Sequence, residues 1–455
     1  MAEKTDVIVI GMGPGGESAA ATLAKAGLRV VGIEKNLVGG ECPYYGCIPS
    51  KMIIRAANAL AEARRVAELA GTAEVVRDFS PVAQRVRDEA TDDWDDTVAV
   101  ERFEKAGGHF VRGTATVTSP TTVQVTGPDG DLEFEAARAI VLNTGTDPAV
   151  PPIPGLAGTP FWTNREAIAA TSAPASLIVL GGGPIGLELA QAFARFGTHV
   201  DVLEGLDRLL PLEEPEASTL IEDVLAAEGL GIHTATRAEG VRHDGKAFTV
   251  TAGDREFSAE RLLVATGRQT HFEALGLASL GLDTSAKVVP TDGYLRVAEG
   301  VYAIGDITGH GAFTHMSMYQ ARIAAAHILD QNPDAASYHA VPHVTFTDPE
   351  IGGVGLTEHQ AREQGVPVAT ATAQVPSSAR GWIHKAGNDG FIKLVADTDR
   401  GILVGATSAG PTGGEVLSML TLAVHERTPI ARLRDMVYAY PTFHRAVEDA
   451  LGRLP

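Results

Sequence analysis

The chain has 455 residues, 44% of them hydrophobic and 21% charged, which is ordinary for a globular protein and enough for about three domains. This composition excludes a disordered, collagen-like or coiled-coil chain. With 37 Lys and Arg against 57 Asp and Glu, the formal net charge is −20, which argues against nucleic acid or an anionic membrane as the main partner.

The first predicted strand, residues 6–10, follows Met1 closely with no signal-peptide pattern, so we expect a cytoplasmic location. It runs into a GxGxxG spacing formed by Gly11, Gly13 and Gly16. A helix pattern and a second strand follow, and Glu34 ends that strand 23 residues after the first glycine. This order is typical of a Rossmann unit, whose glycines allow a tight turn, the approach of a pyrophosphate and close packing of helix on strand, and whose acid binds a ribose hydroxyl.

The two cysteines of the chain, Cys42 and Cys47, come next and lie five positions apart. A structural disulfide is unexpected in the cytosol, and closing so short a loop adds little stability, so the pair suggests redox chemistry. Pro43 suits the first position of a helix, which would place Cys42 at a helix N-terminus that stabilises a thiolate. A metal site would need more ligands than the surrounding sequence offers, so we expect none; a pair of inert thiols is the other alternative.

Residues 114–135 alternate like antiparallel strands, with a turn predicted at residues 127–130. The Rossmann order then returns: a strand over residues 177–180 leads into a second set of glycines, Gly181, Gly183 and Gly186. Glu204 again lies 23 residues after the first glycine. Glycines, a proline and a glutamate interrupt the apolar stretch over residues 176–194, so we expect no membrane insertion. Two matched units predict two bound dinucleotides.

The last third of the chain contains two further strand-to-turn elements and then changes character. Residues 262–268 repeat the pattern of residues 140–146, and another strand ends at Gly305 and Asp306. From Pro342 onward no nucleotide motif appears, and strand and helix patterns alternate. We therefore expect an α/β protein with two Rossmann-like dinucleotide-binding domains and a C-terminal α+β domain.

Taken together, these features resemble the class I flavoprotein disulfide reductases, the family of dihydrolipoamide dehydrogenase, glutathione reductase and mercuric reductase. The resemblance rests on GGECPYYGCIPSK at residues 39–51, the two Rossmann units, the late Gly-Asp motif and the segment that begins at Val341. It implies an FAD-binding domain of residues 1–148 and 271–337, an NAD(P)-binding domain of residues 149–270, and a dimerisation domain of residues 338–455 that forms a homodimer.

The resemblance also assigns site residues. Cys47 would be the sulfur nearest the flavin, where it forms the charge-transfer thiolate, and Cys42 the outer sulfur that exchanges with substrate. Lys51 and Glu188 would form a charged pair beside flavin N5, although Glu188 read alone could be a helix-surface acid. The remaining positions expected to contact FAD or the nicotinamide nucleotide are Gly11, Gly13, Gly16, Glu34, Lys35, Gly40, Ala115, Thr144, Gly145, Gly181, Gly183, Gly186, Glu204, Gly267, Arg268, Gly305, Asp306, Thr314 and His315. Glu204 would repel a 2′-phosphate, which favours NADH over NADPH.

The C-terminal segment departs from the family at its catalytic histidine. Tyr440 stands at the histidine position and Arg445 at that of its glutamate partner, and a tyrosine, with a pKa of about 10, is a poor base at neutral pH. His444 and Glu448 lie four positions apart on a predicted helix. They could form a relocated acid–base pair, although an ordinary surface pair is the favoured interpretation.

We therefore expect a homodimeric FAD enzyme that passes hydride from NADH through the flavin to a Cys42–Cys47 disulfide. The acceptor would be a disulfide or another oxidised sulfur compound, either a small molecule or a small protein. Two alternatives stay open. The flavin could act directly on quinones, metal ions, dyes or a second nicotinamide, as in a transhydrogenase, or the chain could be the dihydrolipoamide dehydrogenase subunit of a 2-oxoacid dehydrogenase complex.

Overall fold

The computed structural model describes residues 2–128 and 130–455, and it divides into two units. Unit 1 comprises Met1–Pro49, Arg85–Ala149 and Arg268–Tyr338, and unit 2 comprises Ser50–Gln84, Val150–Gly267 and His339–Pro455. Unit 1 holds most of the predicted FAD-binding segments. The division of the chain into three domains stays a prediction.

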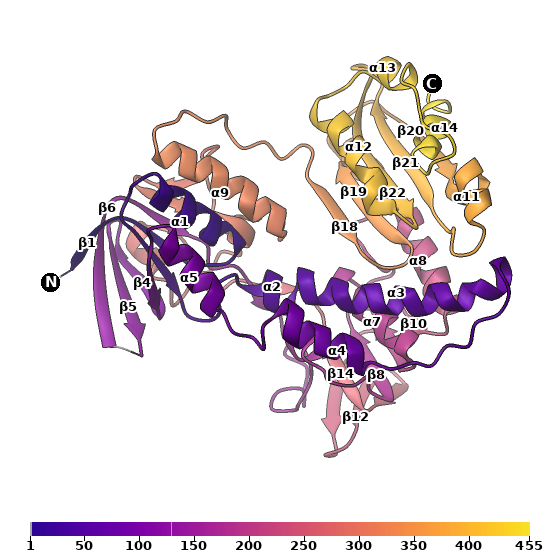
Figure 1. The fold of residues 1–455 in the computed structure, drawn as a ribbon, viewed down its shortest axis with the longest axis horizontal. Helices are drawn as coiled ribbons and strands as arrows, with labels where there is room; N and C mark the ends of the chain where they lie inside the picture. Colours follow the sequence, from indigo (N-terminus) through magenta and orange to yellow (C-terminus); the bar gives the residue numbers. More distant parts are fainter. Residues whose placement is uncertain (1, 129) are drawn as a thin grey trace. The chain divides into compact units, whose positions relative to one another are not determined.

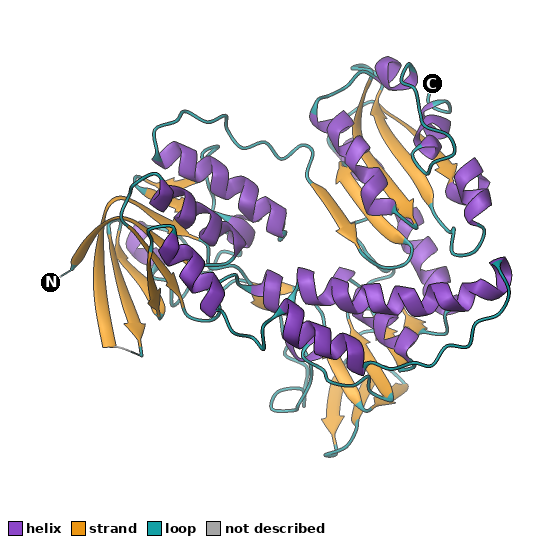
Figure 2. Ribbon diagram, in the orientation of Figure 1, coloured by secondary structure: helices purple, strands orange, loops and turns teal. Residues whose placement is uncertain are grey.

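An eight-stranded sheet forms the centre of unit 1 (Figures 1 and 2). Its main path runs in the order β16 (Arg296–Ala298), β17 (Val301–Ala303), β6 (Gly130–Leu142), β1 (Glu3–Ile10), β2 (Val30–Glu34), β3 (His109–Arg112), while β4 (Thr114–Ser119) pairs with β5 (Thr122–Gly127) and β5 with β6. The expected antiparallel pair is present, because Gly127 lies opposite Gly130; residue 129 of the predicted turn lies outside the described residues. Strands β17, β6, β1, β2 and β3 are parallel, as the Rossmann prediction requires.

The second half of β1, residues 7–10, is apolar without alternation because both of its faces are buried. Val7 and Val9 pack in the cluster that contains α1 (Pro14–Lys25), α5 (Thr97–Lys105) and α9 (Thr314–Ile328), which lie together on one side in Figure 1. Ile8 and Ile10 pack instead with residues of β4, β5 and β6. The glycine turn after β1 is thereby fixed at the buried carboxyl end of the strand, where ligands of parallel sheets bind.

Unit 2 contains the second Rossmann sheet and a separate antiparallel sheet. The first has the order β10 (Gly231–His233), β9 (His199–Leu203), β8 (Ser176–Leu180), β14 (Arg261–Val264), with α7 (Pro184–Phe196) and α8 (Pro215–Ala227) as its helices. A three-stranded antiparallel sheet of β11 (Gly240–His243), β12 (Phe248–Ala252) and β13 (Arg255–Ala259) completes this part. The duplicated Rossmann architecture is confirmed.

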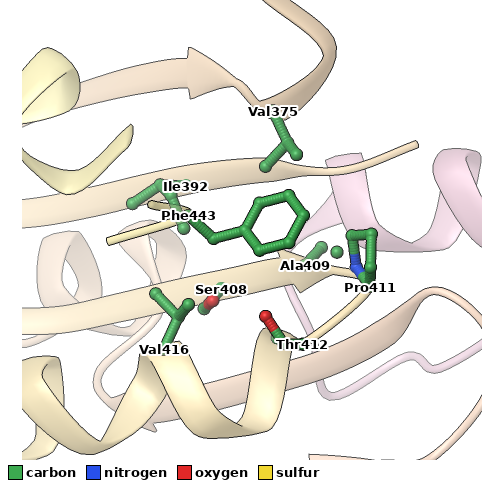
Figure 3. A pocket seen from close by; sticks show the side chains of 10 residues that line it. Val375, Ile392, Ser408, Ala409, Pro411, Thr412, Val416 and Phe443 are labelled. Carbon is green, nitrogen blue, oxygen red and sulfur yellow. The ribbon is translucent and has the colours of Figure 1, made fainter. Parts of the chain in front are cut away.

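The C-terminal part of unit 2 is a five-stranded antiparallel sheet with helices. Its strand order is β18 (Pro342–Thr345), β19 (Glu350–Gly355), β22 (Ile402–Gly410), β21 (Phe391–Asp397), β20 (Val368–Gln374), and its helices are α10 (Glu358–Glu363), α11 (Ala379–His384), α12 (Gly413–His425), α13 (Ile430–Arg434) and α14 (Arg445–Leu451). The ring of Phe443 points into a hollow of about 10 Å³ between Val375, Ile392 and Val416, room for about one water molecule (Figure 3). This contact anchors the segment that carries Tyr440.

The two cysteines lie on two consecutive helices. The short α2 (Glu41–Tyr45) contains Cys42, and the long α3 (Cys47–Leu69) begins at Cys47. Among the described helices, none is both long and apolar enough to cross a membrane.

Candidate active site

The two glycine turns have the same geometry, although they lie in different units. Gly11 has a φ of +89° and Gly181 a φ of +107°, a left-handed conformation that side chains rarely adopt. A Cβ at Gly11 would lie 2.3 Å from the carbonyl oxygen of Asn143, and one at Gly181 would lie 2.4 Å from that of Ala265. The first glycine of each unit is therefore required both by the turn and by the neighbouring backbone.

The third glycine of each unit packs against the first. A Cβ at Gly16 would lie 2.0 Å from the carbonyl oxygen of Gly11, and a Cβ at Gly186 would lie 2.3 Å from that of Gly181. Neither position has space for a methyl group, because the nearest atoms belong to the backbone. The helices α1 and α7 are consequently held close to the turns that precede them.

The middle glycines face open space instead. A Cβ at Gly183 would meet nothing within 4 Å, and one at Gly13 would meet only the Asn143 amide at 3.4 Å. Both glycines immediately precede long helices that begin with proline, Pro14 and Pro184. Open space before unpaired helical N–H groups fits a pyrophosphate, so both turns fit a bound dinucleotide.

The predicted ribose acid of unit 1, Glu34, closes its own turn. Its carboxylate accepts hydrogen bonds from the backbone N–H groups of Met12 and Asn36, both at 2.8 Å. Burial raises the pKa of Glu34, and these two N–H groups together with Arg112 oppose that rise. Each carboxylate oxygen accepts one of these bonds and keeps a second lone pair, which a ribose hydroxyl can use.

Glu204 repeats this arrangement in unit 2. It accepts hydrogen bonds from the N–H groups of Gly182 at 2.6 Å and Leu206 at 2.7 Å. Arg208, four positions after Glu204, is engaged elsewhere, since it donates to the carbonyl oxygens of Pro211 and Glu213. Arg208 is therefore not placed to pair with Glu204.

A polar chain holds Asp306 at the end of β17. Thr146 donates to the Asp306 carboxylate at 2.8 Å, and Arg268 donates to the Thr146 hydroxyl at 2.7 Å and to its carbonyl oxygen at 2.5 Å. Arg268 also lies 3.7 Å from Glu41, which precedes Cys42. Thr146 was not predicted from the sequence, although it directly follows the predicted Thr144 and Gly145.

Asn143, which follows β6, connects three segments through its side chain. Its amide nitrogen donates to the Gly11 carbonyl oxygen at 3.0 Å, and its amide oxygen accepts from Ser317 on α9 at 3.1 Å. The Asn143 side chain thus makes two hydrogen bonds at the base of the first glycine turn. The sequence gives no sign of these partners.

The other predicted cofactor residues are placed as follows: Lys35 is exposed after β2, Gly40 (φ +65°) packs on Gly13, Ala115 is buried in β4, Gly145 (φ +64°) follows Thr144 after β6, Gly267 has φ +115°, Gly305 is buried before Asp306, and Thr314 and His315 begin α9. Gly267 belongs to unit 2, and the others belong to unit 1. Their contacts with a cofactor stay predictions.

The two cysteines lie near the starts of two consecutive helices, α2 and α3. Cys42 is the second residue of α2 and partly buried, whereas Cys47 is exposed and begins the 23-residue helix α3. The sequence placed the helix start at Pro43, but α2 begins two residues earlier, at Glu41, and the long helix begins at Cys47. The Cys47 sulfur lies 3.4 Å from the hydroxyl of Thr314.

Lys51 and Glu188 form the ion pair that the resemblance implies. Lys51 lies one turn after Cys47 on α3, and its ammonium group is 2.8 Å from the Glu188 carboxylate. The second carboxylate oxygen of Glu188 accepts from the Phe346 N–H at 2.8 Å, and the ammonium lies 4.6 Å from the centre of the Phe346 ring. Glu188 is only 6% exposed, which excludes a helix-surface acid. Phe346 was not predicted from the sequence.

The C-terminal residues do not form the relocated His444–Glu448 pair that the sequence allowed. Glu448 lies 2.6 Å from Arg445, three positions before it, and the Arg445 guanidinium lies 5.5 Å from the ring centre of Tyr440. His444 is exposed and precedes α14. The observed partner of Glu448 is thus Arg445 rather than His444, because the i,i+3 guanidinium competes for the same carboxylate.

The comparisons with known proteins agree with this geometry. Residues 5–327 match the family described as pyridine nucleotide-disulphide oxidoreductase, and residues 341–451 match its dimerisation domain. A dihydrolipoyl dehydrogenase of Halobacterium salinarum is 34% identical over 98% of this chain and 95% of its own, and a mercuric reductase of Streptomyces lividans is 33% identical over the same shares.

Solved structures resemble the whole chain as well. The Cu(II) complex of the HOCl-induced flavoprotein disulfide reductase RclA from Escherichia coli has a TM-score of 0.86 at 27% identity, covering 99% of both chains. LpdA from Mycobacterium tuberculosis has a TM-score of 0.87 at 25% identity over the same shares.

Proposed function

The chain belongs to the pyridine nucleotide-disulphide oxidoreductase family, and from this premise we propose that it moves electrons from NADH to a small disulfide or other oxidised sulfur acceptor. As a member of this family it is an FAD-dependent, NAD(P)H-using enzyme with a redox-active disulfide. The observation that carries the proposal is the Cys42–Cys47 pair around α2, followed one helical turn later by Lys51.

The residues of unit 1 fit FAD. Gly13 leaves room for the pyrophosphate, Glu34 keeps lone pairs for the adenosine ribose, and Asp306 is oriented by Thr146. When bound there, FAD would supply the hydride-accepting and electron-transferring chemistry between the nicotinamide and the disulfide. The remaining chemistry belongs to side chains of this chain.

We assign Lys51 the role of a fixed cation beside the flavin. The ion pair with Glu188 and the contact with the Phe346 ring hold the ammonium group in one place, so it needs no reorganisation when negative charge develops. Glu188 is a positioning residue because it acts through Lys51. Cys42 is the outer sulfur and Cys47 the inner one, with the Thr314 hydroxyl able to donate a hydrogen bond to the Cys47 sulfur.

We also propose that the enzyme is a homodimer. Residues 341–451 match the dimerisation domain of the family, and this part exposes large apolar side chains that a partner would cover. Val437 is 93% exposed, Trp382 75% and Tyr440 69%.

The preferred nucleotide is NADH. A 2′-phosphate at the ribose position would meet the carboxylate of Glu204, and Arg208 donates to backbone oxygens instead of standing ready to neutralise it. We expect kcat/KM for NADH to exceed that for NADPH by about tenfold or more, which corresponds to about 1.4 kcal/mol of discrimination. Steady-state assays with both nucleotides measure this ratio, and a preference for NADPH would contradict the assignment.

Thiol blocking tests the proposed function. The enzyme is treated with N-ethylmaleimide either as isolated in its oxidised form or after anaerobic addition of NADH, and is then assayed with a disulfide. We expect inactivation only after NADH, because only then are the Cys42 and Cys47 thiolates present to react. A reduced, alkylated enzyme that still reduces disulfides at the full rate would exclude a dithiol relay.

A second candidate is direct reduction of quinones, metal ions or dyes by the flavin. Tyr440 favours it, because the chain lacks the histidine that would serve as acid and base for a thiol substrate, and such help is worth about 10²- to 10⁴-fold. Proteins similar to this chain include a mercuric reductase and a flavoprotein disulfide reductase solved as a Cu(II) complex. Under this function, the alkylated enzyme would keep its quinone activity. The same missing histidine argues against a dihydrolipoamide dehydrogenase subunit, despite the relatives that bear this name.

A further inference from the structure

A cleft of about 770 Å³ opens beside the outer cysteine in unit 1. It is lined by α1, by the segment around α2 and by residues 88–106, and Cys42 is among its lining residues. Sites for small molecules have volumes of about 300–1,000 Å³, so this cleft can admit a small disulfide with both of its substituents. An acceptor bound in this cleft would lie beside Cys42, which the proposed function assigns as the exchanging sulfur.

Carboxylates predominate on the cleft wall. Its charged lining residues are Glu17, Lys25, Asp88, Glu89, Asp92, Asp95 and Arg102. Three of the five carboxylates have arginine partners, at distances of 2.5 Å for Glu17–Arg102, 2.6 Å for Asp88–Arg87 and 3.0 Å for Glu89–Arg85. Asp92 and Asp95 therefore supply the uncompensated negative charge.

Neither of these two aspartates has an ion pair within the described part of the chain. Asp95 accepts hydrogen bonds from the N–H of Thr97 at 2.8 Å and from its hydroxyl at 2.5 Å, and these bonds lower the pKa of Asp95. Asp92 is exposed in a left-handed conformation with φ +48°. The lowered pKa keeps the Asp95 carboxylate charged at neutral pH.

The two cationic residues that line the cleft, Lys25 and Arg102, do not neutralise the negative charge of Asp92 and Asp95. Arg102 is engaged with Glu17, and Lys25 lies eleven residues beyond Pro14 on α1, roughly 16 Å along the helix axis. Tyr44, which also lines the cleft, stays uncharged, because burial and the carboxylates of Asp96 and Glu17 raise its pKa to about 12. An anionic acceptor would thus meet net repulsion on its way to the sulfur.

We propose that Asp92 and Asp95 make this cleft selective for cationic disulfides and against anionic ones. The inference rests on the proposed function, because it takes Cys42 as the exchanging sulfur. In the reaction, the Cys42 thiolate attacks one sulfur of the acceptor and forms a mixed disulfide, and the first thiolate leaves and takes up a proton. The Cys47 thiolate then attacks the Cys42 sulfur, which releases the second thiol and re-forms the Cys42–Cys47 disulfide. NADH supplies the two electrons.

Three small disulfides with the same core test this selectivity. Cystamine carries two positive charges, 2-hydroxyethyl disulfide none, and 3,3′-dithiodipropionate two negative charges at pH 7. We expect kcat/KM to fall in that order, with a span of about tenfold or more at low salt that narrows at high salt because the charges are exposed. Assays of all three with NADH, at two ionic strengths, measure the span.

The variant Asp92→Asn/Asp95→Asn tests the residues. Asparagine tolerates the left-handed conformation and keeps the side-chain oxygen that Thr97 contacts, so the backbone is preserved. Asp283→Asn is the matched control, because Asp283 accepts the same pair of bonds from Ser285 but does not line the cleft. We expect the double variant to lower the cystamine-to-dithiodipropionate ratio by about threefold or more, and the control to leave it unchanged.

The outcomes separate the two claims. Equal turnover of the three disulfides, or an unchanged ratio in the double variant, or an equal change in Asp283→Asn, would overturn the selectivity while leaving the proposed function intact. Turnover of none of the three, with active quinone reduction, would overturn both.

Discussion

Cys42→Ser and Cys47→Ser are each expected to lower NADH-dependent disulfide reduction by about 10³-fold or more. Each substitution removes one of the two sulfurs that must form the redox disulfide, and residues that act as a unit lose nearly all activity when either is removed. A serine hydroxyl preserves the size of the side chain, so the glycine turn, α2 and α3 should stay folded. Steady-state assays with 2-hydroxyethyl disulfide and NADH measure the loss.

Tyr45→Phe is the control for this pair of variants. Tyr45 lies between the two cysteines, and its ring stacks on Trp94 with the ring centres 6.4 Å apart, a contact that phenylalanine preserves. Its disulfide reduction should stay near the wild-type rate. Substantial disulfide reduction by either serine variant would contradict the relay and favour direct chemistry at the flavin.

Replacement of Glu188 should have the second largest effect. Glu188→Gln removes the charge that holds Lys51 but keeps an acceptor for the Phe346 N–H, whereas Glu188→Ala removes both partners. We expect both variants to slow the reduction of bound FAD by NADH about 10²- to 10³-fold, the usual cost of losing one preorganised electrostatic contact. Glu188→Ala should also lower the free energy of unfolding by about 1 kcal/mol, because it leaves the partly buried Phe346 N–H without its acceptor. Anaerobic stopped-flow and denaturant unfolding measure the two quantities.

Glu62→Gln provides a matched control on α3, the helix that carries Lys51. Glu62 pairs with Arg65 at 2.6 Å but is 57% exposed, and exposed pairs contribute about 0–1 kcal/mol. Its FAD reduction should be normal. If Glu188→Gln also reduces FAD at the wild-type rate, Glu188 has no positioning role and the buried pair is purely structural.

The sequence was sufficient to predict the repeated features of the fold. The glycine spacing and the acid 23 residues later imply a definite backbone geometry, and Gly11 and Gly181 adopt it with the same close contacts. The Lys51–Glu188 pair spans 137 positions along the chain. It came from resemblance to a family, since no local pattern links residues so far apart.

The contacts that could not be predicted from the sequence depend on how loops and strand ends come together in the tertiary structure. Thr146 connects Arg268 to Asp306 because strands distant in sequence end at the same edge of the sheet. Trp94 reaches Tyr45 from a segment in which residues 92–94 all have positive φ after a π-helix over Val86–Ala90, a conformation that composition does not predict. Glu448 could be expected to meet His444 at i,i+4, but the competing i,i+3 arginine decides its partner.

The central claim is that NADH opens a disulfide between Cys42 and Cys47. The chain has no other cysteine, so every thiol that appears can be assigned to this pair. One equivalent of NADH is added anaerobically to the oxidised enzyme, excess N-ethylmaleimide follows, and the labels are counted by mass spectrometry. We expect no label before NADH and two labels per chain after it, one on each cysteine. A label count that NADH does not change would contradict it.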